Sequence, residues 1–362
     1  MKVLIVHDEP VGEGYGAEAY VRRLVEGLRA AGDTVEVMAG ERRHRGFGKV
    51  FDLADPVARR MLADRAKQFA PDVVHHHNIA RELSASVLGA TPGVPLVMTL
   101  HDRRLFGARE HPLGSPRRLV EATGAARVLR AARRRLTATI GVSDAVSDLA
   151  RAAGLPSVST VPVPAADPVG VLVPAAQCHD VVVVARLAAD KGVDVVIDAF
   201  AAVAAQTGTC RLLIAGDGPQ RAALERRARP LGSRVAFLGW LDELELSPVL
   251  GRSRLVVVAS VPGRRPEGSS LAAVEAAAHG RAVIGCDDAA VAEVVRGLGA
   301  GPVVAAGDAT ALSRELHRLL TDDAAVASYA AAAVAGAARH SIPAVAGATS
   351  AVYGAAVEAG AR

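Results

Sequence analysis

Short apolar runs alternate with longer segments rich in Ala, Leu and Arg along the whole chain. The first half contains VLIV, TVEVM, DVVH, LVMTL, ATIGVS and VSTVPV, and the second contains DVVVVAR, CRLLIAG, RVAFLG, RLVVVAS, RAVIG and GPVVAA. Continuous apolar runs of this length are typical of strands buried on both faces, which occur in parallel sheets with helical crossovers. The alternation therefore predicts an α/β protein with doubly wound, mainly parallel sheets.

The pattern restarts after a proline-rich stretch, VPVPAADPVGVLVPAAQ, at residues 161–177. A chain of 362 residues is also too long for one ordinary hydrophobic core. We therefore expect two Rossmann-like domains, at residues 1–165 and 175–344.

Composition argues against several classes of protein. A net charge of +4 does not by itself imply nucleic acid. The three cysteines are few, odd in number and far apart, so they indicate neither a disulfide framework nor a paired-cysteine metal site. The N-terminus MKVLIVHDEP lacks a cleavage region, and the uncharged stretch at residues 341–357 is too short and too rich in Ala, Gly and Ser for a membrane span. We expect a cytoplasmic protein, either a monomer or a homodimer.

Ligands of doubly wound sheets bind at the carboxyl ends of the strands. The residues directly after each apolar run are therefore the first candidates for a binding site. After the first run, three glycines precede a helix expected to begin near Ala17. The spacing Gly12-x-Gly14-x-x-Ala17 approximates a dinucleotide fingerprint, but four residues separate it from the strand and Glu36 lies inside the next run. A dehydrogenase is thus a minor alternative. The loop is either a flexible connection or one that substrate approaches closely.

Histidines close two other apolar runs. His75, His76 and His77 are consecutive, and adjacent strand residues point to opposite faces, so the three cannot bind one metal ion. A hydrogen-bonding role at the strand end is the expected one. His101 ends the run LVMTL, and its position alone is more typical of a structural histidine.

Two cations follow the first run of the second half. Arg186 comes directly after the strand, and Lys191 precedes a helix. A guanidinium, an ammonium and helix N–H groups together could bind a diphosphate. Composition alone would favour two solvated surface charges, but the position at a strand-to-helix junction favours the diphosphate site. The next run ends in a similar turn at Gly216, which is a weak signal because it could be only a connection.

Two glutamates lie eight positions apart near residue 270. Glu267 is in a turn-rich stretch, and Glu275 is inside a helix expected from Leu271 to His279 and ended by Gly280. The helix dipole explains Glu267, whereas a buried Glu275 needs a partner, and polyol hydroxyls are suitable donors.

In order and spacing, these motifs resemble those of the retaining glycosyltransferases of family 4, over nearly the full length. They are the Gly loop with GAE, DVVHHHN, TLHD, ARLAADKGVDVVIDAF, LLIAGDGP, VAFLGW, and E-x7-E followed by AAAHGRAVIG. The resemblance implies the GT-B fold of two facing Rossmann-like domains. It also implies that the last helix, at about residues 345–362, packs back on the first domain.

The resemblance also assigns roles on the donor. Glu275 should hold the ribose hydroxyls and Glu267 the hydroxyls of the donor sugar. The backbone N–H groups near the donor phosphates should be those of Ser269, Ser270 and Leu271.

Further roles concern the leaving group and the reacting carbon. Arg186 and Lys191 should bind the diphosphate and stabilise it as it departs. His101 should lie near the reacting sugar carbon, and Gly16 and Gly216 should line the donor site. No metal or other cofactor is expected.

The chain also departs from the family pattern. The usual E-G-F-G-L is E-G-S-S-L, and DDAAVAE replaces a Gly-Gly turn before Pro-Glu, which affects the role expected of Glu293. Pro-Asn-Gly is absent from the linker, and HDRRLFG lacks the aromatic and Cys-Pro that often follow His-Asp. We therefore expect a retained nucleotide pocket with specialised sugar and acceptor sides.

The resemblance predicts a retaining hexosyl- or N-acetylhexosaminyl-type transferase of natural-product or glycoconjugate biosynthesis. Its partners would be a nucleoside-diphosphate sugar, with UDP favoured over GDP, and a small polar or phosphorylated acceptor. The alternatives are a catalytically degenerate GT-B protein that only binds nucleotide sugars, and a sugar-nucleotide epimerase.

The segment PRRLVEATGAARVLRAARRRL, residues 116–136, is strongly basic. Three readings stay open: a solvated helix face, then electrostatic capture of an acidic acceptor, and last a weak membrane contact through an apolar stripe. That stripe would comprise Leu119, Val128, Leu129, Ala132 and Leu136.

Overall fold

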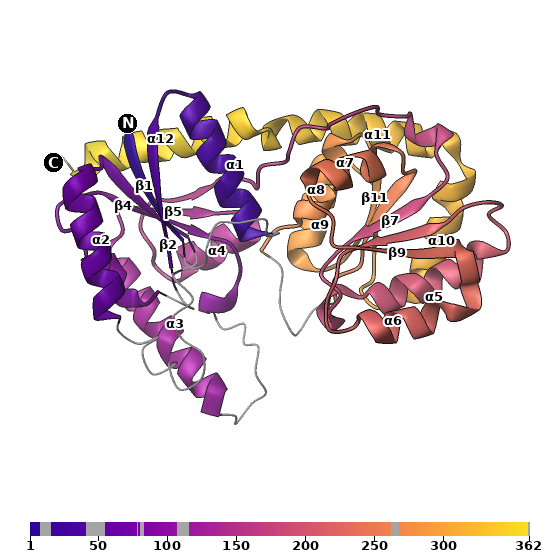
Figure 1. Cartoon of the computed structure of the whole chain (residues 1–362), viewed down its shortest axis with the longest axis horizontal. Coiled ribbons are helices and arrows are strands. Elements are labelled where there is room, and N and C mark those ends of the chain that lie inside the picture. Colours follow the sequence, from indigo (N-terminus) through magenta and orange to yellow (C-terminus); the bar gives the residue numbers. More distant parts are fainter. Residues whose placement is uncertain are drawn as a thin grey trace. The chain divides into compact units, whose positions relative to one another are not determined.

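The computed structural model describes residues 1–7, 16–40, 55–77, 79, 83–106, 116–261 and 268–360, of which 104 and 116–121 are described by backbone alone. The chain divides into two compact units. Unit 1 comprises Met1–Pro164 and Ile342–Arg362, and unit 2 comprises Ala165–Ser341. Each unit is a parallel sheet with helices between its strands, as the apolar runs predicted (Figure 1).

Unit 1 is built on a six-stranded sheet with the order β2-β1-β3-β4-β5-β6. Its strands are β1 (Lys2–His7), β2 (Thr34–Ala39), β3 (Val73–His77), β4 (Leu96–Leu100), β5 (Ala138–Gly141) and β6 (Val158–Thr160). Its helices are α1 (Ala17–Ala30), α2 (Pro56–Phe69), α3 (Pro116–Arg135), α4 (Asp144–Ala152) and α12 (Ile342–Gly360), with short 3-10 helices η2 (Ala85–Gly89) and η3 (Arg104–Phe106).

Unit 2 repeats the design with the strand order β12-β11-β10-β7-β8-β9. Its strands are β7 (Val181–Val184), β8 (Leu212–Ala215), β9 (Val235–Gly239), β10 (Leu255–Val258), β11 (Ala282–Cys286) and β12 (Val303–Val304). Its helices are α5 (Val193–Ala204), α6 (Arg221–Ala228), α7 (Glu243–Gly251), α8 (Leu271–Ala278), α9 (Ala289–Leu298), α10 (Ala309–Thr321) and α11 (Asp323–Ala337).

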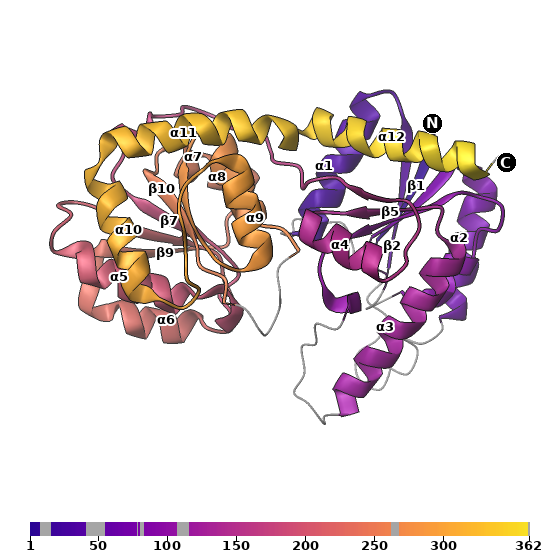
Figure 2. The ribbon, with the colours of Figure 1, turned by 180° about the vertical axis from the view of Figure 1, so that it is seen from behind.

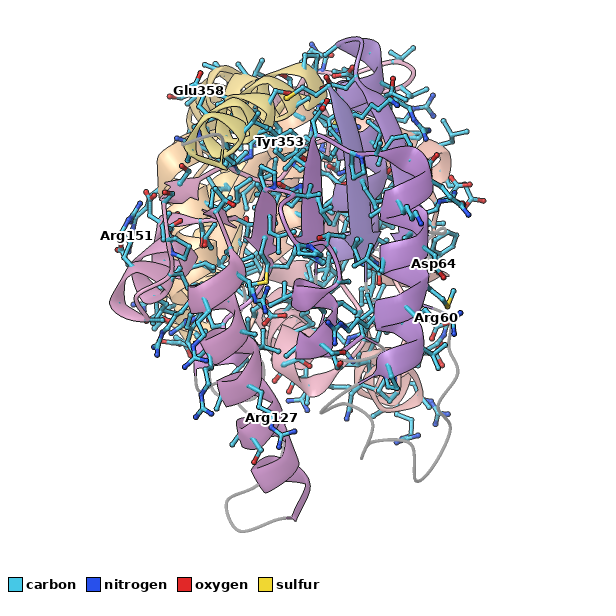
Figure 3. The ribbon with its side chains drawn as sticks, turned by 90° about the vertical axis from the view of Figure 1, so that its left-hand side faces the viewer. Arg60, Asp64, Arg127, Arg151, Tyr353 and Glu358 are labelled. Atoms are coloured by element: carbon cyan, nitrogen blue, oxygen red, sulfur yellow. The ribbon has the colours of Figure 1, made fainter. Side chains whose placement is uncertain are left out.

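The last helix, α12, belongs to unit 1 although unit 2 precedes it in the sequence. It lies along α1 (Figure 2), and it also packs against β3 and β4. A side chain on Gly27 would collide with Ala346 and Ile342, its Cβ lying 2.8 Å from each, so this glycine permits the close approach of α1 and α12. Tyr353, on the same helix, points into the unit and is fully buried (Figure 3).

The basic helix α3 turns its apolar residues into unit 1. Val128, Ala132 and Leu136 are buried, and the helix packs against η2 and η3. The arginines from Arg127 onward are exposed, and Arg127 projects outward from the helix (Figure 3). Of the three readings of this segment, the solvated face is therefore the one that the packing supports, because the described part of the apolar stripe covers the unit's own core. Within the described residues, no helix combines the length and apolar character needed to cross a membrane.

A buried arginine fixes the start of unit 2 to its core. Arg281 is 2 % exposed and donates to the backbone oxygens of Val173 (2.8 Å), Ser253 (2.7 Å) and His279 (2.7 Å). Burial lowers the pKa of Arg281 below its ordinary value, yet three carbonyl acceptors surround the guanidinium. The proline-rich stretch therefore follows a defined path along unit 2.

Candidate functional site

Three loops of unit 2 meet at one edge of its sheet. The strands β10, β7 and β8 are adjacent and parallel, so the loops that follow them lie side by side. Arg186 and Lys191 follow β7, and Gly216 follows β8. Residues 268–270, which lead into α8, come after β10. Arg186, Lys191, Gly216 and the start of α8 therefore share one edge.

Arg186 is held in place by a neighbour that the sequence analysis did not single out. Its Nη2 donates to both carboxylate oxygens of Asp190, at 3.1 and 3.3 Å. The Arg186 side chain is 44 % exposed, whereas that of Asp190 is only 10 % exposed. Asp190 thus orients a guanidinium that still reaches solvent. The i, i+4 spacing of opposite charges was the available signal.

Lys191 ends a short 3-10 helix, η5 (Ala189–Lys191), in a connection that a close backbone contact fixes. Gly192, which follows it, has a φ of 59°, and a Cβ there would lie 2.1 Å from the backbone oxygen of Ala259. The backbone oxygen of Asp190 also accepts from the N–H of Val261 at 2.9 Å. The loop after β7 is thereby joined to the segment that leaves β10.

The loop after β8 is joined to the same place from the other side. Gly216 has a φ of 138°, and a Cβ on it would lie 1.9 Å from the backbone oxygen of Ala185. The N–H of Leu187 donates to the backbone oxygen of Asp217 at 2.9 Å. Gly216 is required by this packing, and a role in ligand binding stays a prediction.

The N-terminus of α8 is formed by the serines of the unusual E-G-S-S-L. Ser270 is the N-cap, and its Oγ accepts from the N–H of Ala273 at 3.3 Å. Its φ of −110° is one that any residue adopts, so the helix starts normally without the glycine of the family pattern. The Oγ of Ser269 is buried and has no hydrogen-bond partner among the described residues. Glu267 lies outside the described residues, so its role on the donor sugar stays a prediction.

Glu275 lies in the second turn of α8, and it is 5 % exposed. The helix is fixed at both ends, by the cap at Ser270 and by His279 at its C-terminus. The Nδ1 of His279 is 2.7 Å from the backbone oxygen of Glu275, and its Nε2 is 2.8 Å from Ser247 Oγ. A carboxylate buried on a helix fixed in this way suits a ligand-holding role.

In unit 1, the predicted hydrogen-bonding role is confirmed for His75 and His77 but not for His76, whose two ring nitrogens are buried without a hydrogen-bond partner among the described residues. His75 lies 2.6 Å from the hydroxyl of Tyr353 through Nδ1 and 2.7 Å from Thr99 Oγ1 through Nε2. The Nδ1 of His77 is 2.9 Å from the Nε2 of His101. No group of three or more His, Cys, Asp or Glu side chains in the described ranges is arranged to hold a metal ion.

His75, His76 and His77 are neutral because they are buried. Burial lowers the pKa of His75 and His77 well below the ordinary value and lowers that of His76 to about 3. His101 follows β4 and is half-buried. Its ring meets that of Tyr20 edge to face, with centroids 4.7 Å apart.

Gly16 lies at the same edge of unit 1 as His101, because Tyr20 is one turn beyond Gly16 in α1. Gly16 has a φ of 76° and is the N-cap of the helix, which begins at Ala17 as predicted. The remainder of the glycine loop, residues 8–15, lies outside the described residues.

The dinucleotide reading of this loop loses its acidic partner. Glu36 lies in the middle of β2 and accepts from Arg65 Nε at 2.6 Å. A carboxylate committed to an arginine inside a strand is poorly placed for a ribose. The structure thus gives no support to a dehydrogenase.

Two family models match the chain, and together they span most of it. The model described as Glycosyltransferase Family 4 matches residues 15–164, and the model described as Glycosyl transferases group 1 matches residues 178–322. The chain therefore belongs to the family 4 glycosyltransferases, and its two parallel six-stranded sheets are those of the GT-B fold.

Individual relatives agree with this assignment. The chain is 38 % identical over 82 residues to alpha-D-kanosaminyltransferase of Streptomyces kanamyceticus, covering 22 % of this chain and 21 % of the relative. It is 31 % identical over 142 residues to phosphatidyl-myo-inositol mannosyltransferase of Mycobacterium leprae, covering 39 % and 37 %. These matches thus span well under half of either relative.

A solved structure shows that the likeness in fold is much wider. Sucrose-phosphate synthase from Thermosynechococcus elongatus superposes with a TM-score of 0.75 at 19 % identity, covering 98 % of both chains. At this identity the likeness concerns the fold alone.

Proposed function

We propose that this protein transfers a sugar from a nucleoside diphosphate to a small polar or phosphorylated acceptor, with retention of the anomeric configuration. UDP is the favoured nucleotide, and GDP is the second choice. The sugar would be a hexose or an N-acetylhexosamine. Family membership supports the general reaction, and the arrangement of unit 2 supports the way in which the donor is bound.

The observation that carries the proposal is the position of Arg186. Its guanidinium reaches solvent and is oriented by Asp190. It lies at the same edge of the sheet as the start of α8. Negative charge develops on the β-phosphate as the bond to the sugar breaks. A fixed cation and a helix N-terminus stabilise such charge without reorganising.

The proposed chemistry keeps attack and departure on one face of the sugar. The bond from the anomeric carbon to the phosphate oxygen breaks, and the acceptor oxygen forms the new bond to that carbon. The acceptor proton passes to an oxygen of the departing phosphate, so no separate side-chain base is needed. That no divalent metal is needed stays a prediction.

Thermal unfolding with a panel of UDP, GDP and ADP tests donor binding. A nucleotide at 100 times its Kd stabilises the folded state by about 2.7 kcal/mol. We expect UDP to stabilise the wild type and Glu275→Gln to abolish most of that effect. Glu315→Gln is the control, since Glu315 is paired with Arg318 on α10 and is not one of the candidate site residues. No stabilisation by any of the three nucleotides would contradict the proposal.

Turnover assays with the matching sugar nucleotides then separate the alternatives. Transfer to an added acceptor supports the proposal. Binding without turnover would indicate a catalytically degenerate protein, for which the E-G-S-S-L sequence is the best argument. Epimerised sugar formed without acceptor would indicate an epimerase.

A further inference from the structure

The rings that surround His77 are an unusual feature of unit 1. The ring centroid of His77 lies 4.1 Å from that of His75, 5.2 Å from that of His101 and 5.6 Å from that of Tyr20. His77 itself is fully buried. We call His75, His77 and His101, with Tyr20 and Tyr353, the histidine cluster.

The titratable groups that face His77 come from its own strand and from the elements packed against it. His7 faces it from β1, Tyr20 from α1, and His75 and His76 belong to its own strand. Burial raises the pKa of Tyr20 and of Tyr353, which contacts His75, above the ordinary value. The tyrosines are therefore uncharged, and burial keeps His77 neutral as well.

A neutral His77 has one ring proton, and its surroundings decide which nitrogen carries it. Its Nδ1 is 2.9 Å from His101 Nε2, whereas its Nε2 is buried and has no hydrogen-bond partner among the described residues. A buried N–H without an acceptor is rarer and costlier than a buried lone pair without a donor. The proton therefore belongs on Nδ1, where it has an acceptor.

We infer that His77 is a positioning residue that fixes the tautomer of His101. His77 donates from Nδ1 to Nε2 of His101, so Nε2 of His101 is an acceptor and its ring proton lies on Nδ1. Nδ1 of His101 is therefore an N–H donor rather than a basic nitrogen. The importance of this tautomer for sugar transfer rests on the proposed function, which places His101 near the reacting carbon.

Heteronuclear NMR of the ring nitrogens tests the tautomer directly. Two-bond ¹H–¹⁵N spectra distinguish a protonated ring nitrogen from an unprotonated one. The chain has 11 histidines, so the His101 signals are assigned by their loss in His101→Asn. We expect Nδ1 protonated and Nε2 unprotonated in the wild type. A wild-type His101 protonated at Nε2 overturns the inference.

Two substitutions at His77 differ in the atom they replace. Asparagine places an amide N–H where Nδ1 lies, and glutamine places it where Nε2 lies. We expect His77→Asn to keep the His101 tautomer and His77→Gln to lose it. His76→Gln is the control for a buried amide on the same strand, because His76 points to the opposite face. An unchanged tautomer in His77→Gln would overturn the role given to His77.

Activity supplies a second reading. We expect His77→Gln to lower kcat about 10- to 100-fold, as when a group that orients a functional histidine is removed, and His77→Asn to restore most of it. The spectra need neither donor nor acceptor, so they decide the tautomer even if the chain does not transfer sugar. If His77→Gln does not fold, the wild-type spectrum and His77→Asn still decide the question. If His77→Gln changes the His101 tautomer but leaves kcat unchanged, the tautomer is not important for sugar transfer.

Discussion

Replacing Arg186 with alanine should reduce sugar transfer while leaving the fold almost unchanged. The pair with Asp190 is 3.1 Å long, but the Arg186 side chain is 44 % exposed. Solvent screens such a pair, so its loss should cost no more than about 1 kcal/mol of stability. The melting temperature should then fall by no more than about 2–4 °C.

The cost to catalysis should be larger because the leaving phosphate loses a charged donor. A hydrogen bond to a charged group contributes about 1.5–3 kcal/mol. If the contact strengthens in the transition state, that loss lowers kcat and kcat/KM together, by about 10- to 150-fold. Steady-state kinetics across donor concentrations measures both constants.

Arg211→Ala is the matched control. Arg211 pairs with Asp180 at 2.6 Å and its side chain is 54 % exposed, but it precedes β8 and so lies at the opposite edge of the sheet. It should show a similar small change in stability with no change in kcat. Equal kinetic losses in the two variants, or a fully active Arg186→Ala, would refute the reasoning.

Three further predictions concern packing and pH. Gly216→Ala should lower the free energy of unfolding, measured in urea, by at least about 2 kcal/mol, because the new Cβ would lie 1.9 Å from a carbonyl oxygen. The control Gly208→Ala, which has open space around it, should lower the same free energy by about 1 kcal/mol. Arg281→Met should lower the free energy of unfolding by at least about 3 kcal/mol in the same assay, because three backbone acceptors lose their donor. Arg226 is exposed, so Arg226→Met should leave that free energy nearly unchanged. The pKa of His76 falls from 6.5 to about 3 on folding, so the unfolded state binds the extra proton and stability is lost as the pH falls below 6.5. Between pH 7.5 and pH 5 His76→Leu should therefore lose about 2 kcal/mol less than the wild type, and equal acid sensitivity of the two proteins would contradict this.

Much of the architecture follows from local sequence pattern. Ten of the twelve apolar runs became strands of four to six residues, and the other two became β6 and β12, of three and two residues. Runs of this kind can be buried on both faces only inside a covered parallel sheet. The bounds of α8 were also predictable, since Ser270 caps its start and Gly280, with a φ of 64°, follows its end. Arg186 and Glu275 could be proposed because of their places after a strand and within a buried helix.

Other features depend on residues far apart in the sequence, which only the tertiary structure brings together. The sequence shows that His77 and His101 each end a strand, but their hydrogen bond exists because β3 and β4 are neighbours in register. Gly216 looked like an ordinary turn glycine until its contact with Ala185 across two loops gave the reason for it. Periodicity and capping are local and can be read from the chain, whereas a ring tautomer or a loop-to-loop contact is set by partners that folding supplies.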